Sequence, residues 1–286
     1  MKTILISHVY QKAKPYLADL FDSLNSQTDK DFDVVIFNYG LDEPLSAFGY
    51  YGQEVFNVFG YGIPDARDWA LKYALEHRYE LLVFVDADDV MAPDRIEKTK
   101  GAFENGIGFF YTDLHVLSQP QVDFFSGKLP DKLVTWRSIL ECNFVGLSNF
   151  AINVQAASRI IRKISCPIEV VAYDWYLATI LLLEGLKGLK VDSITFYRLH
   201  DLNTAGRTNE INSEILFKTV TVKMRHYKAV KGYCVSNGIT KLSTLYEERY
   251  LKYKNLYESA REEGFDVLKD SLNVGGCESS YWWNLI

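Results

Sequence analysis

LLVFVDADDVMAPDR, from Leu81 to Arg95, is the stretch of this chain that decides the fold. It begins with five apolar residues, among them two valines and a phenylalanine. Such a run predicts a strand buried on both faces, as parallel strands in α/β sheets are. Three aspartates, Asp86, Asp88 and Asp89, follow within four residues. Because open α/β sheets hold their ligands at the carboxyl ends of their strands, the stretch predicts an acidic ligand site at that edge of a sheet.

The three aspartates form a DxD pattern, and they repel one another unless a cation lies among them. Hard divalent ions take carboxylate oxygens as ligands, so Mn²⁺ or Mg²⁺ is the expected cofactor. An acidic turn in water is the alternative, because aspartate is also a common turn residue. The apolar strand directly before the motif favours the metal.

Composition and charge exclude several classes of protein. The chain has 286 residues, of which 48% are hydrophobic, so it can bury a substantial core. Its formal net charge of −6 argues against nucleic acid as a partner. The four cysteines are widely spaced without a C-x-x-C pair, which favours free thiols in a reducing compartment. The apolar runs are too short for a signal peptide or a membrane span. We therefore expect a cytoplasmic protein, or one held peripherally at the inner face of the membrane.

Strands and helices alternate along the first two thirds of the chain. The predicted strands are residues 3–6, 32–37, 54–59, 81–85, 107–111, 144–152 and 190–197, and the predicted helices are residues 16–27, 64–76, 95–104, 155–163 and 173–184. Residues 114–132 are expected to form a loop. The alternation is typical of a mostly parallel sheet flanked by helices. No glycine-rich phosphate loop follows the first strand, which disfavours both the dinucleotide fold and the P-loop.

The pattern changes after Gly206, where lysine and arginine are interleaved with tyrosine and phenylalanine. This pattern predicts two or three amphipathic helices that are interrupted near Asn237-Gly238. We therefore divide the chain into an α/β domain, residues 1–206, and a mainly helical C-terminal extension, residues 207–286. The helices could pack their aromatic face on the rest of the protein, position an acceptor, or touch an anionic membrane.

Several segments together resemble the inverting family 2 glycosyltransferases, which have the GT-A fold. The resemblance covers roughly residues 1–206. The markers are Ser7-His8-Val9-Tyr10, SLNSQTDKDFDVVI at residues 23–36, Gly62-Ile63-Pro64-Asp65-Ala66-Arg67-Asp68, Asp86-Ala87-Asp88-Asp89, Tyr173-Asp174-Trp175 and Tyr197-Arg198-Leu199-His200. It implies a transfer of sugar, with inversion, from a nucleotide-diphosphate donor to a hydroxyl acceptor.

The resemblance also implies a nucleotide-sugar site. Its residues are Ser7, His8, Tyr10, Asn38, Asp65, Arg67, Asp86, Ala87 and Asp88. In this site Tyr10 would stack on the base, and Asp88 would bind the metal that bridges the two phosphates. The family often has Asp-Asp-Gly where this chain has Asn38-Tyr39-Gly40, which leaves the identity of the base open.

Three further residues take roles from the resemblance. Asp174 matches the catalytic base, a role that needs a carboxylate within reach of the attacking hydroxyl; capping the helix is the alternative. His200 matches a further metal ligand, and a surface position is the alternative. Trp175 is expected to stack on an acceptor sugar, with packing in the core as the alternative.

The sequence thus predicts a metal-dependent glycosyltransferase that acts on a glycan or a lipid-linked acceptor in bacterial surface polysaccharide or glycan assembly. The segments around Asp174 and His200 are also similar to bacterial rhamnosyltransferases. A nucleotidyltransferase or pyrophosphorylase is one alternative, although its expected glycine-rich, lysine-bearing loop is missing. A catalytically silent module that binds nucleotide sugars is another, motivated by the departure at Asn38-Tyr39.

Overall fold

The computed structural model describes residues 1–50, 52, 55–104, 106–199, 212–271, 281, 283 and 285–286. The chain divides into two compact units. Unit 1 is made of Met1–Trp136, Phe144–Ser165 and Leu181–Leu199, and unit 2 of Arg137–Asn143, Cys166–Ile180 and His200–Ile286. The second unit thus takes in two segments that lie before residue 206, and the boundary predicted there stays a prediction.

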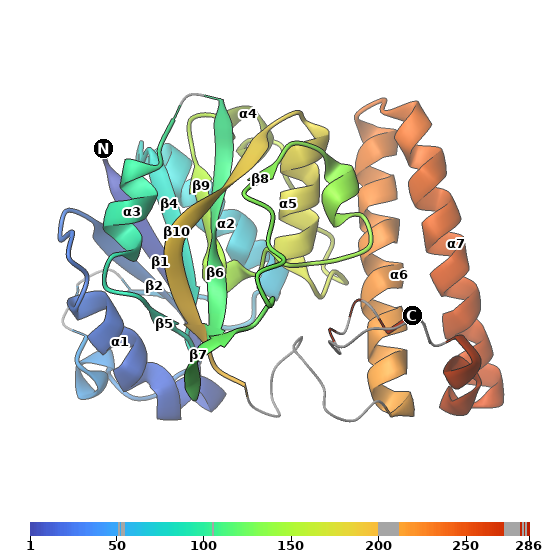
Figure 1. Cartoon of the computed structure of the whole chain (residues 1–286), viewed down its shortest axis with the longest axis horizontal. Helices are drawn as coiled ribbons and strands as arrows, with labels where there is room; N and C mark the ends of the chain where they lie inside the picture. The colour runs from blue at the N-terminus through green and yellow to red at the C-terminus, as the bar shows by residue number, and fades with distance from the viewer. Residues whose placement is uncertain are drawn as a thin grey trace. The chain divides into compact units, whose positions relative to one another are not determined.

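Unit 1 is built on a sheet that has ten strands in the described residues, in the order β3-β2-β1-β4-β9-β6-β10-β5 with β7 beside β6 and β8 beside β10 (Figure 1). The strands are β1 Thr3–Tyr10, β2 Asp33–Tyr39, β3 Val55–Asn57, β4 Leu81–Asp86, β5 Val90–Met91, β6 Ile107–Val116, β7 Gln119–Asp123, β8 Lys132–Leu133, β9 Phe150–Asn153 and β10 Lys187–Tyr197. Strands β1 to β4 run parallel, as do β6 and β10. The predicted α/β class is confirmed.

The helices follow the predicted order. They are α1 Leu17–Asn25, α2 Ile63–Glu76, α3 Arg95–Gly101, α4 Ser158–Ile161, α5 Tyr173–Leu183, α6 Ser213–Ser236 and α7 Thr240–Glu263. Short 3₁₀ helices include η1 Gln11–Tyr16, η3 Trp136–Ile139 and η4 Leu147–Asn149. Proline in the first turn of α2 suits a helix start, because its ring fixes a helical φ and its missing N–H is not needed there.

Both faces of the sheet are covered, which explains why β4 is apolar without alternation. On one face Leu5 and Val83 pack in a buried cluster with Leu20 of α1 and Ile96 of α3. On the other face α2 packs against β2, and the ring of Trp69 meets that of Phe37 edge-on at 5.1 Å. A strand enclosed in this way is apolar on both sides, because every side chain leaves water.

The parallel register places the carboxyl ends of three strands at one edge of the sheet. His8 of β1 is paired with Phe37 of β2 and with Asp86 of β4. Asn38 of β2 is the partner of Val9. The acidic motif after β4 therefore lies beside the ends of β1 and β2, as expected for a ligand site in this class of fold.

Two features of the sheet differ from the sequence-based expectation. Residues 114–132 were expected to form a loop, but Gln119–Asp123 forms β7, which pairs antiparallel with β6. Most of β7 is exposed, so it lacks the apolar alternation by which a half-buried strand is recognised. Strand β9 runs antiparallel between β4 and β6, and nothing in its apolar sequence indicates a direction.

Helices α6 and α7 of unit 2 form a long antiparallel pair (Figure 1). The turn between them contains Gly238 with φ of 71°, a conformation that glycine adopts without strain, so the predicted interruption at Asn237-Gly238 is confirmed. The aromatic residues Tyr227, Tyr246 and Tyr253 are buried between the helices. None of the helices in the described part of the chain has the length and hydropathy needed to cross a bilayer.

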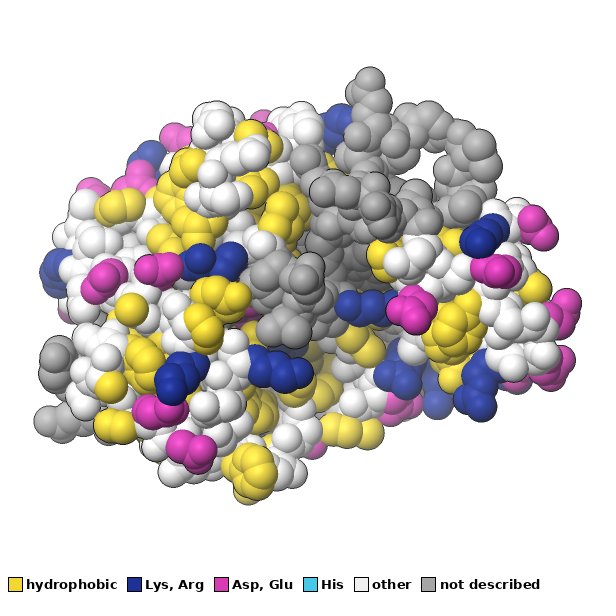
Figure 2. Space-filling model, turned by 90° about the horizontal axis from the view of Figure 1, so that it is seen from below, with side chains coloured by type: hydrophobic (Ala, Val, Ile, Leu, Met, Phe, Trp, Pro, Cys, Tyr) yellow, Lys and Arg dark blue, Asp and Glu magenta, His cyan; other side chains and the backbone are white. Residues whose placement is uncertain are grey.

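Acidic and basic side chains are interspersed on the face of the molecule seen in Figure 2.

Candidate functional site

The acidic motif forms a tight turn at the end of β4. The Asp89 N–H donates to the Asp86 carbonyl at 3.2 Å, and the Asp86 N–H donates to the Ser148 hydroxyl at 2.8 Å. Asp89 is buried and Ala87 packs in the core, whereas Asp86 and Asp88 are partly exposed. Burial and the charges of Asp88 and Asp86 raise the pKa of Asp89 well above its ordinary value. The first two carboxylates of the turn thus face the accessible side, and the third belongs to its interior.

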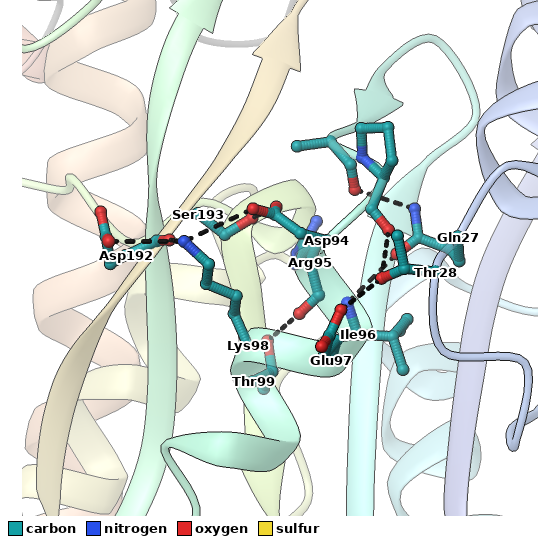
Figure 3. Close-up of polar contacts among 12 residues, drawn as sticks. Gln27, Thr28, Asp94, Arg95, Ile96, Glu97, Lys98, Thr99, Asp192 and Ser193 are labelled. Carbon is teal, nitrogen blue, oxygen red and sulfur yellow. Dashed lines mark hydrogen bonds and ion pairs between the residues drawn. The ribbon is translucent and has the colours of Figure 1, made fainter.

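Helix α3, which follows the motif, is held in place by side-chain contacts with two other segments of the chain (Figure 3). The Ser193 hydroxyl donates to Asp94 at 2.7 Å, and Lys98 forms ion pairs with Asp94 at 3.5 Å and Asp192 at 3.4 Å. On the other side the Thr28 hydroxyl donates to Glu97 at 2.6 Å. These contacts fix α3 to β10 and to the segment after α1, and the turn before α3 is fixed with it.

A buried arginine lies under the acidic turn. The guanidinium of Arg95 donates to the carbonyl of Phe84 at 3.0 Å and to the Thr195 hydroxyl at 2.9 Å, and also to the carbonyl of Ser148. Burial lowers the pKa of Arg95 to about 9, while Asp89 and Asp86 act in the opposite direction. The side chain remains a cation at neutral pH, so it offsets part of the negative charge above it. Sequence patterns did not indicate this role.

Two side chains of β1 carry polar atoms that are buried without a hydrogen-bond partner among the described residues. These atoms are the Ser7 hydroxyl oxygen and both ring nitrogens of His8. Burial, and secondarily the charge of Arg67, lower the pKa of His8 to about 3, so the imidazole is neutral and offers one donor and one acceptor. Buried polar groups are rarely left unpaired in native proteins, so these atoms, at the ligand edge of the sheet, are candidates for pairing with a ligand.

The other residues predicted for the nucleotide-sugar site come close to this edge. Burial and then the charges of Asp88 and Asp86 raise the pKa of Tyr10, and Arg67 acts in the opposite direction. Arg67 also acts on Tyr39, whose pKa burial raises to about 12. The structure therefore brings Tyr10, Arg67 and the acidic turn within electrostatic reach of one another.

Asn38 and Asp65 occupy more constrained positions than the others. The Asn38 side chain closes the turn after β2, donating to the Leu41 carbonyl at 3.0 Å and accepting from the Leu41 N–H at 2.7 Å. Asp65 lies in the first turn of α2 and contributes to the raised pKa of Tyr39. The side chain of Asn38 is thus hydrogen-bonded to the backbone. The family often has a carboxylate at this position.

Asp86 and Asp88 are the residues that could hold a divalent ion. Carboxylate oxygens suit Mg²⁺ and Mn²⁺, and Mg²⁺ is commonly bound by one or two carboxylates together with phosphate oxygens of a substrate. Among the described residues no group of three or more candidate ligands gathers around a metal position. His200, the predicted further ligand, lies outside the described residues. Within the part of the chain that the structure describes, the carboxylates of Asp86 and Asp88 fit an ion shared with a diphosphate.

Asp174 lies in the first turn of α5, within unit 2. Its Oδ1 accepts a hydrogen bond from the Trp175 N–H at 2.7 Å and from the Asn143 side-chain amide at 3.3 Å. Both contacts hold the carboxylate in place at the start of the helix. The arrangement is compatible with a cap and with a general base, so Asp174 as the base stays a prediction.

The expectation that Trp175 stacks on an acceptor sugar is not supported. Its side chain is 0% exposed, and the ring stacks on His226 at a centroid distance of 3.7 Å. The indole N–H donates to the Ile139 carbonyl at 2.7 Å. Because one ring face is covered and the ring is enclosed, Trp175 is a core residue of unit 2, the alternative that the sequence had left open.

Sequence comparison identifies the family of the N-terminal part. Residues 5–116 match the family model described as glycosyl transferase family 2. No curated protein matches the sequence. The matched residues include Ser7, His8, Arg67 and the acidic turn, whereas Asp174 and the C-terminal helices lie outside them.

Solved structures with the same fold include Staphylococcus aureus TarS, residues 1–349. It is 14% identical to this chain with a TM-score of 0.55, and the alignment covers 92% of each chain. The complex of this protein with UDP is 16% identical with a TM-score of 0.55 and the same coverage. Its complex with UDP-GlcNAc is 14% identical with a TM-score of 0.54, covering 93% of this chain and 89% of the other.

These findings confirm the resemblance seen in the sequence. The chain carries a family 2 glycosyltransferase domain, matched over residues 5–116, and its α/β architecture is that of the GT-A fold. The protein is a glycosyltransferase.

Proposed function

We propose that this enzyme transfers a sugar from a nucleotide diphosphate to a hydroxyl group, with inversion, and that it depends on Mn²⁺ or Mg²⁺ at Asp86 and Asp88. The observation that carries the proposal is that Ser7 and His8 each carry unpaired buried polar atoms at the end of β1, where His8 is paired with Asp86 of the acidic motif. Uncharged hydrogen-bonding atoms suit a nucleoside, and carboxylates that recruit a cation suit the diphosphate attached to it.

A uridine-diphosphate sugar is the first donor to test. S. aureus TarS, which shares the fold, has been crystallised with UDP and with UDP-GlcNAc. In this chain Tyr10 would stack on the base, and the neutral His8 would hydrogen-bond to the nucleoside. The side chain of Asn38 is engaged with Leu41, so it contributes at most its remaining hydrogen-bonding capacity.

The chemistry assigned to the chain's own residues is general base catalysis. The Asp174 carboxylate takes the proton of the acceptor hydroxyl as its oxygen bonds to the anomeric carbon of the donor. The bond from that carbon to the diphosphate oxygen breaks, and its electron pair leaves with the nucleoside diphosphate. A bound divalent ion supplies the positive charge that stabilises this leaving group. Attack opposite the leaving group inverts the anomeric centre.

We further propose a glycan or lipid-linked acceptor, in bacterial surface polysaccharide or glycan assembly, and a cytoplasmic enzyme that reaches the inner face of the membrane peripherally. The support is the resemblance of the Asp174 and Arg198 segments to glycosyltransferases of that kind, together with the basic residues of α6 and α7. The acceptor would then be presented by the C-terminal helices.

Titration calorimetry with UDP, other nucleoside diphosphates and UDP-GlcNAc, in Mn²⁺ and in EDTA, tests the proposal. We expect one class of nucleotide to bind more tightly in Mn²⁺ than in EDTA. In Asp88→Ala the affinity in Mn²⁺ should fall to that in EDTA. Asp94→Asn is the matched control, because Asp94 lies in the same stretch and contacts Ser193 and Lys98 (Figure 3).

Each outcome of the titration favours one reading of the site. Equal affinity of Asp88→Ala and the unaltered chain in both buffers contradicts the metal site. A preference for nucleoside triphosphates would favour the nucleotidyltransferase alternative. Metal-dependent UDP binding without release of UDP from any sugar donor would favour the silent module.

A further inference from the structure

Arg198, at the end of β10, joins parts of unit 1 that are far apart in the sequence. Its Nε donates to the main-chain carbonyl of Asp88 at 2.8 Å, and its Nη2 donates to the Asp19 carboxylate at 2.6 Å. The guanidinium also lies over the ring of Tyr16, 4.6 Å from its centre. One side chain therefore connects the acidic turn with α1 and the 3₁₀ helix η1 before it.

The main chain of the same residue adds a contact to the motif. The Arg198 N–H donates to Asp89 Oδ1 at 2.8 Å, so the end of β10 holds both the carbonyl of Asp88 and the side chain of Asp89. Arg95 donates to the carbonyls of Phe84, in β4, and of Ser148, in η4. Arg198 thus holds the turn itself, and Arg95 holds the strand before it, each through main-chain oxygen atoms.

We infer that Arg198 is a positioning residue for the divalent ion of the donor complex, and this inference rests on the proposed function. Its bond goes to the carbonyl of Asp88, so this contact does not consume the carboxylate that would bind the ion. Fixing the carbonyl limits the movement of the residue whose side chain is the ligand. Residues that orient metal ligands typically cost about 10- to 100-fold in metal affinity when they are replaced.

The charge of Arg198 does not by itself argue against this role. A cation beside a metal site repels the metal, but the guanidinium is paired with Asp19 in a salt bridge of 2.6 Å. The pair is close to neutral, so its field at the motif is weaker than that of an isolated arginine. The repulsion is therefore reduced, while the hydrogen bonds that hold the turn are kept.

The arginine side chain is suited to this position by its shape. The planar guanidinium presents several N–H groups in fixed directions, so it can donate to Asp88 and Asp19 at once while it stacks on Tyr16. A lysine carries the same charge on a single flexible ammonium group. Lysine at this position keeps the charge but does not reproduce the three contacts together.

The inference is tested by Mn²⁺ binding without turnover. The Kd of UDP is measured by calorimetry in Mn²⁺ and in EDTA, and free Mn²⁺ is measured by electron paramagnetic resonance. We expect Arg198→Ala to raise the Kd in Mn²⁺ about tenfold and to leave the Kd in EDTA unchanged. Arg198→Lys should lie between Arg198→Ala and the unaltered chain.

A matched charge control is available on α3. Lys98→Ala removes a positive charge whose described partners are Asp94 and Asp192 (Figure 3). It should leave both Kd values unchanged. An equal loss in Lys98→Ala and Arg198→Ala would mean a general charge effect and would overturn the inference.

The remaining outcomes are also decisive. Unchanged Kd values in Arg198→Ala overturn the inference, and so does an equal loss in Mn²⁺ and EDTA, because the residue would then act on the nucleotide or on the fold. If thermal denaturation shows that Arg198→Ala is not folded, Arg198→Lys and Asp19→Asn are measured in its place. Each of them is expected to raise the Kd of UDP in Mn²⁺. Absence of any Mn²⁺ effect in the unaltered chain refutes the metal site of the proposed function, whereas a Mn²⁺ effect retained in every variant refutes the role of Arg198 alone.

Discussion

The imidazole of His8 is a buried neutral group whose nitrogen atoms have no hydrogen-bond partner among the described residues. Leaving such atoms unpaired costs free energy in the ligand-free protein, and a nucleoside that pairs with them recovers it. His8→Leu removes both nitrogens and keeps a side chain of similar size. We expect UDP to bind about 3- to 10-fold more weakly, from the loss of about one hydrogen bond, while the free energy of unfolding is unchanged or higher.

The measurement that separates His8 from the acidic turn is UDP calorimetry in Mn²⁺ and in EDTA. The loss in His8→Leu should be equal in the two buffers, because a neutral imidazole contributes nothing to a divalent ion bound elsewhere. Asp88→Ala, in contrast, should lose affinity only in Mn²⁺. A His8→Leu variant that binds UDP as the unaltered chain does would contradict the nucleoside role.

Asp174 is predicted to act only in the chemical step. Asp174→Asn keeps the size of the side chain and an oxygen that can accept from the Trp175 N–H, but an amide cannot take the proton. Release of UDP from the donor in the presence of acceptor should fall by roughly 100-fold or more, with UDP affinity unchanged. Asp192→Asn, at an exposed acid of β10, is the control. Turnover near the normal rate in Asp174→Asn would remove this residue from the mechanism.

Some roles of single residues were readable in the sequence and others were not. The acidic turn was predictable because the apolar run and the aspartates after it are adjacent in the sequence. Arg95 and Arg198 were missed because their contacts with β4 and its turn depend on how distant strands pair. The core position of Trp175, one of the two alternatives, is favoured by the sequence, since α5 is apolar on all sides and a helix of that kind is expected to be buried all round.

Helix α6 is connected to the segment that contacts Asp174. The Tyr227 hydroxyl is within hydrogen-bonding distance of the Leu140 carbonyl, at 2.8 Å, and of Glu141, at 3.0 Å. Asn143 follows in the same segment, three residues after Leu140, and its side-chain amide donates to Asp174 at 3.3 Å. All of these residues belong to unit 2. The C-terminal helices therefore contribute to the surroundings of the predicted base, a connection that no local pattern of the sequence indicated.

Lys223 of α6 is expected to make the free energy of unfolding depend on pH. Burial lowers the pKa of Lys223 from 10.5 to about 8, although its ammonium group donates to the Ile286 carbonyl at 2.7 Å. Between pH 8 and 10.5 the unfolded chain therefore binds a proton that the folded chain does not. The free energy of unfolding should rise with pH in this range, by about 3 kcal/mol in total for a shift of this size.

The contribution of Lys223 is isolated by comparing variants. Lys223→Met preserves the length of the side chain and removes the titrating group, so the rise between pH 8 and 9.5 should be lost. Lys228→Met is the control, because Lys228 is exposed on the same helix and pairs with Glu169. Urea denaturation followed by tryptophan fluorescence gives the free energies. The same pH dependence in Lys223→Met and the unaltered chain would show that burial of this lysine is not its cause.

The types and the order of the helices and strands were largely predictable from the sequence, whereas the directions of the strands in the sheet were not. Hydrophobic periodicity and turn residues indicated the succession from β1 to β4 and the break between α6 and α7, because these signals are local. The antiparallel direction of β9 and the pairing of β7 arise from contacts between segments distant in the sequence. No local pattern carries that information, and this is why the sheet was expected to be more uniformly parallel than it is.

The chain as a whole combines a family 2 domain with a pair of helices in which basic residues outnumber acidic ones. The interleaving of these basic residues with tyrosine and phenylalanine motivated the prediction of membrane contact, but several of the basic residues have acidic partners. Lys228 pairs with Glu169 at 3.2 Å and Arg249 with Glu141 at 2.8 Å, and Lys231 pairs with Glu247. Paired side chains contribute less to attraction by an anionic surface, so only a weak interaction is expected.

Membrane contact is testable by sedimentation with vesicles. The tyrosines buried between α6 and α7 are not available for insertion, so attraction must come from exposed basic residues such as Lys241 and Lys252. Each contributes at most about 1 kcal/mol near an anionic bilayer, and salt screens this attraction. We expect part of the protein to sediment with phosphatidylserine vesicles at low salt, none with neutral vesicles, and less after Lys241→Glu combined with Lys252→Glu. If the full chain stays in the supernatant with anionic vesicles at low salt, the peripheral role is wrong, and the basic residues of these helices serve packing or acceptor binding instead.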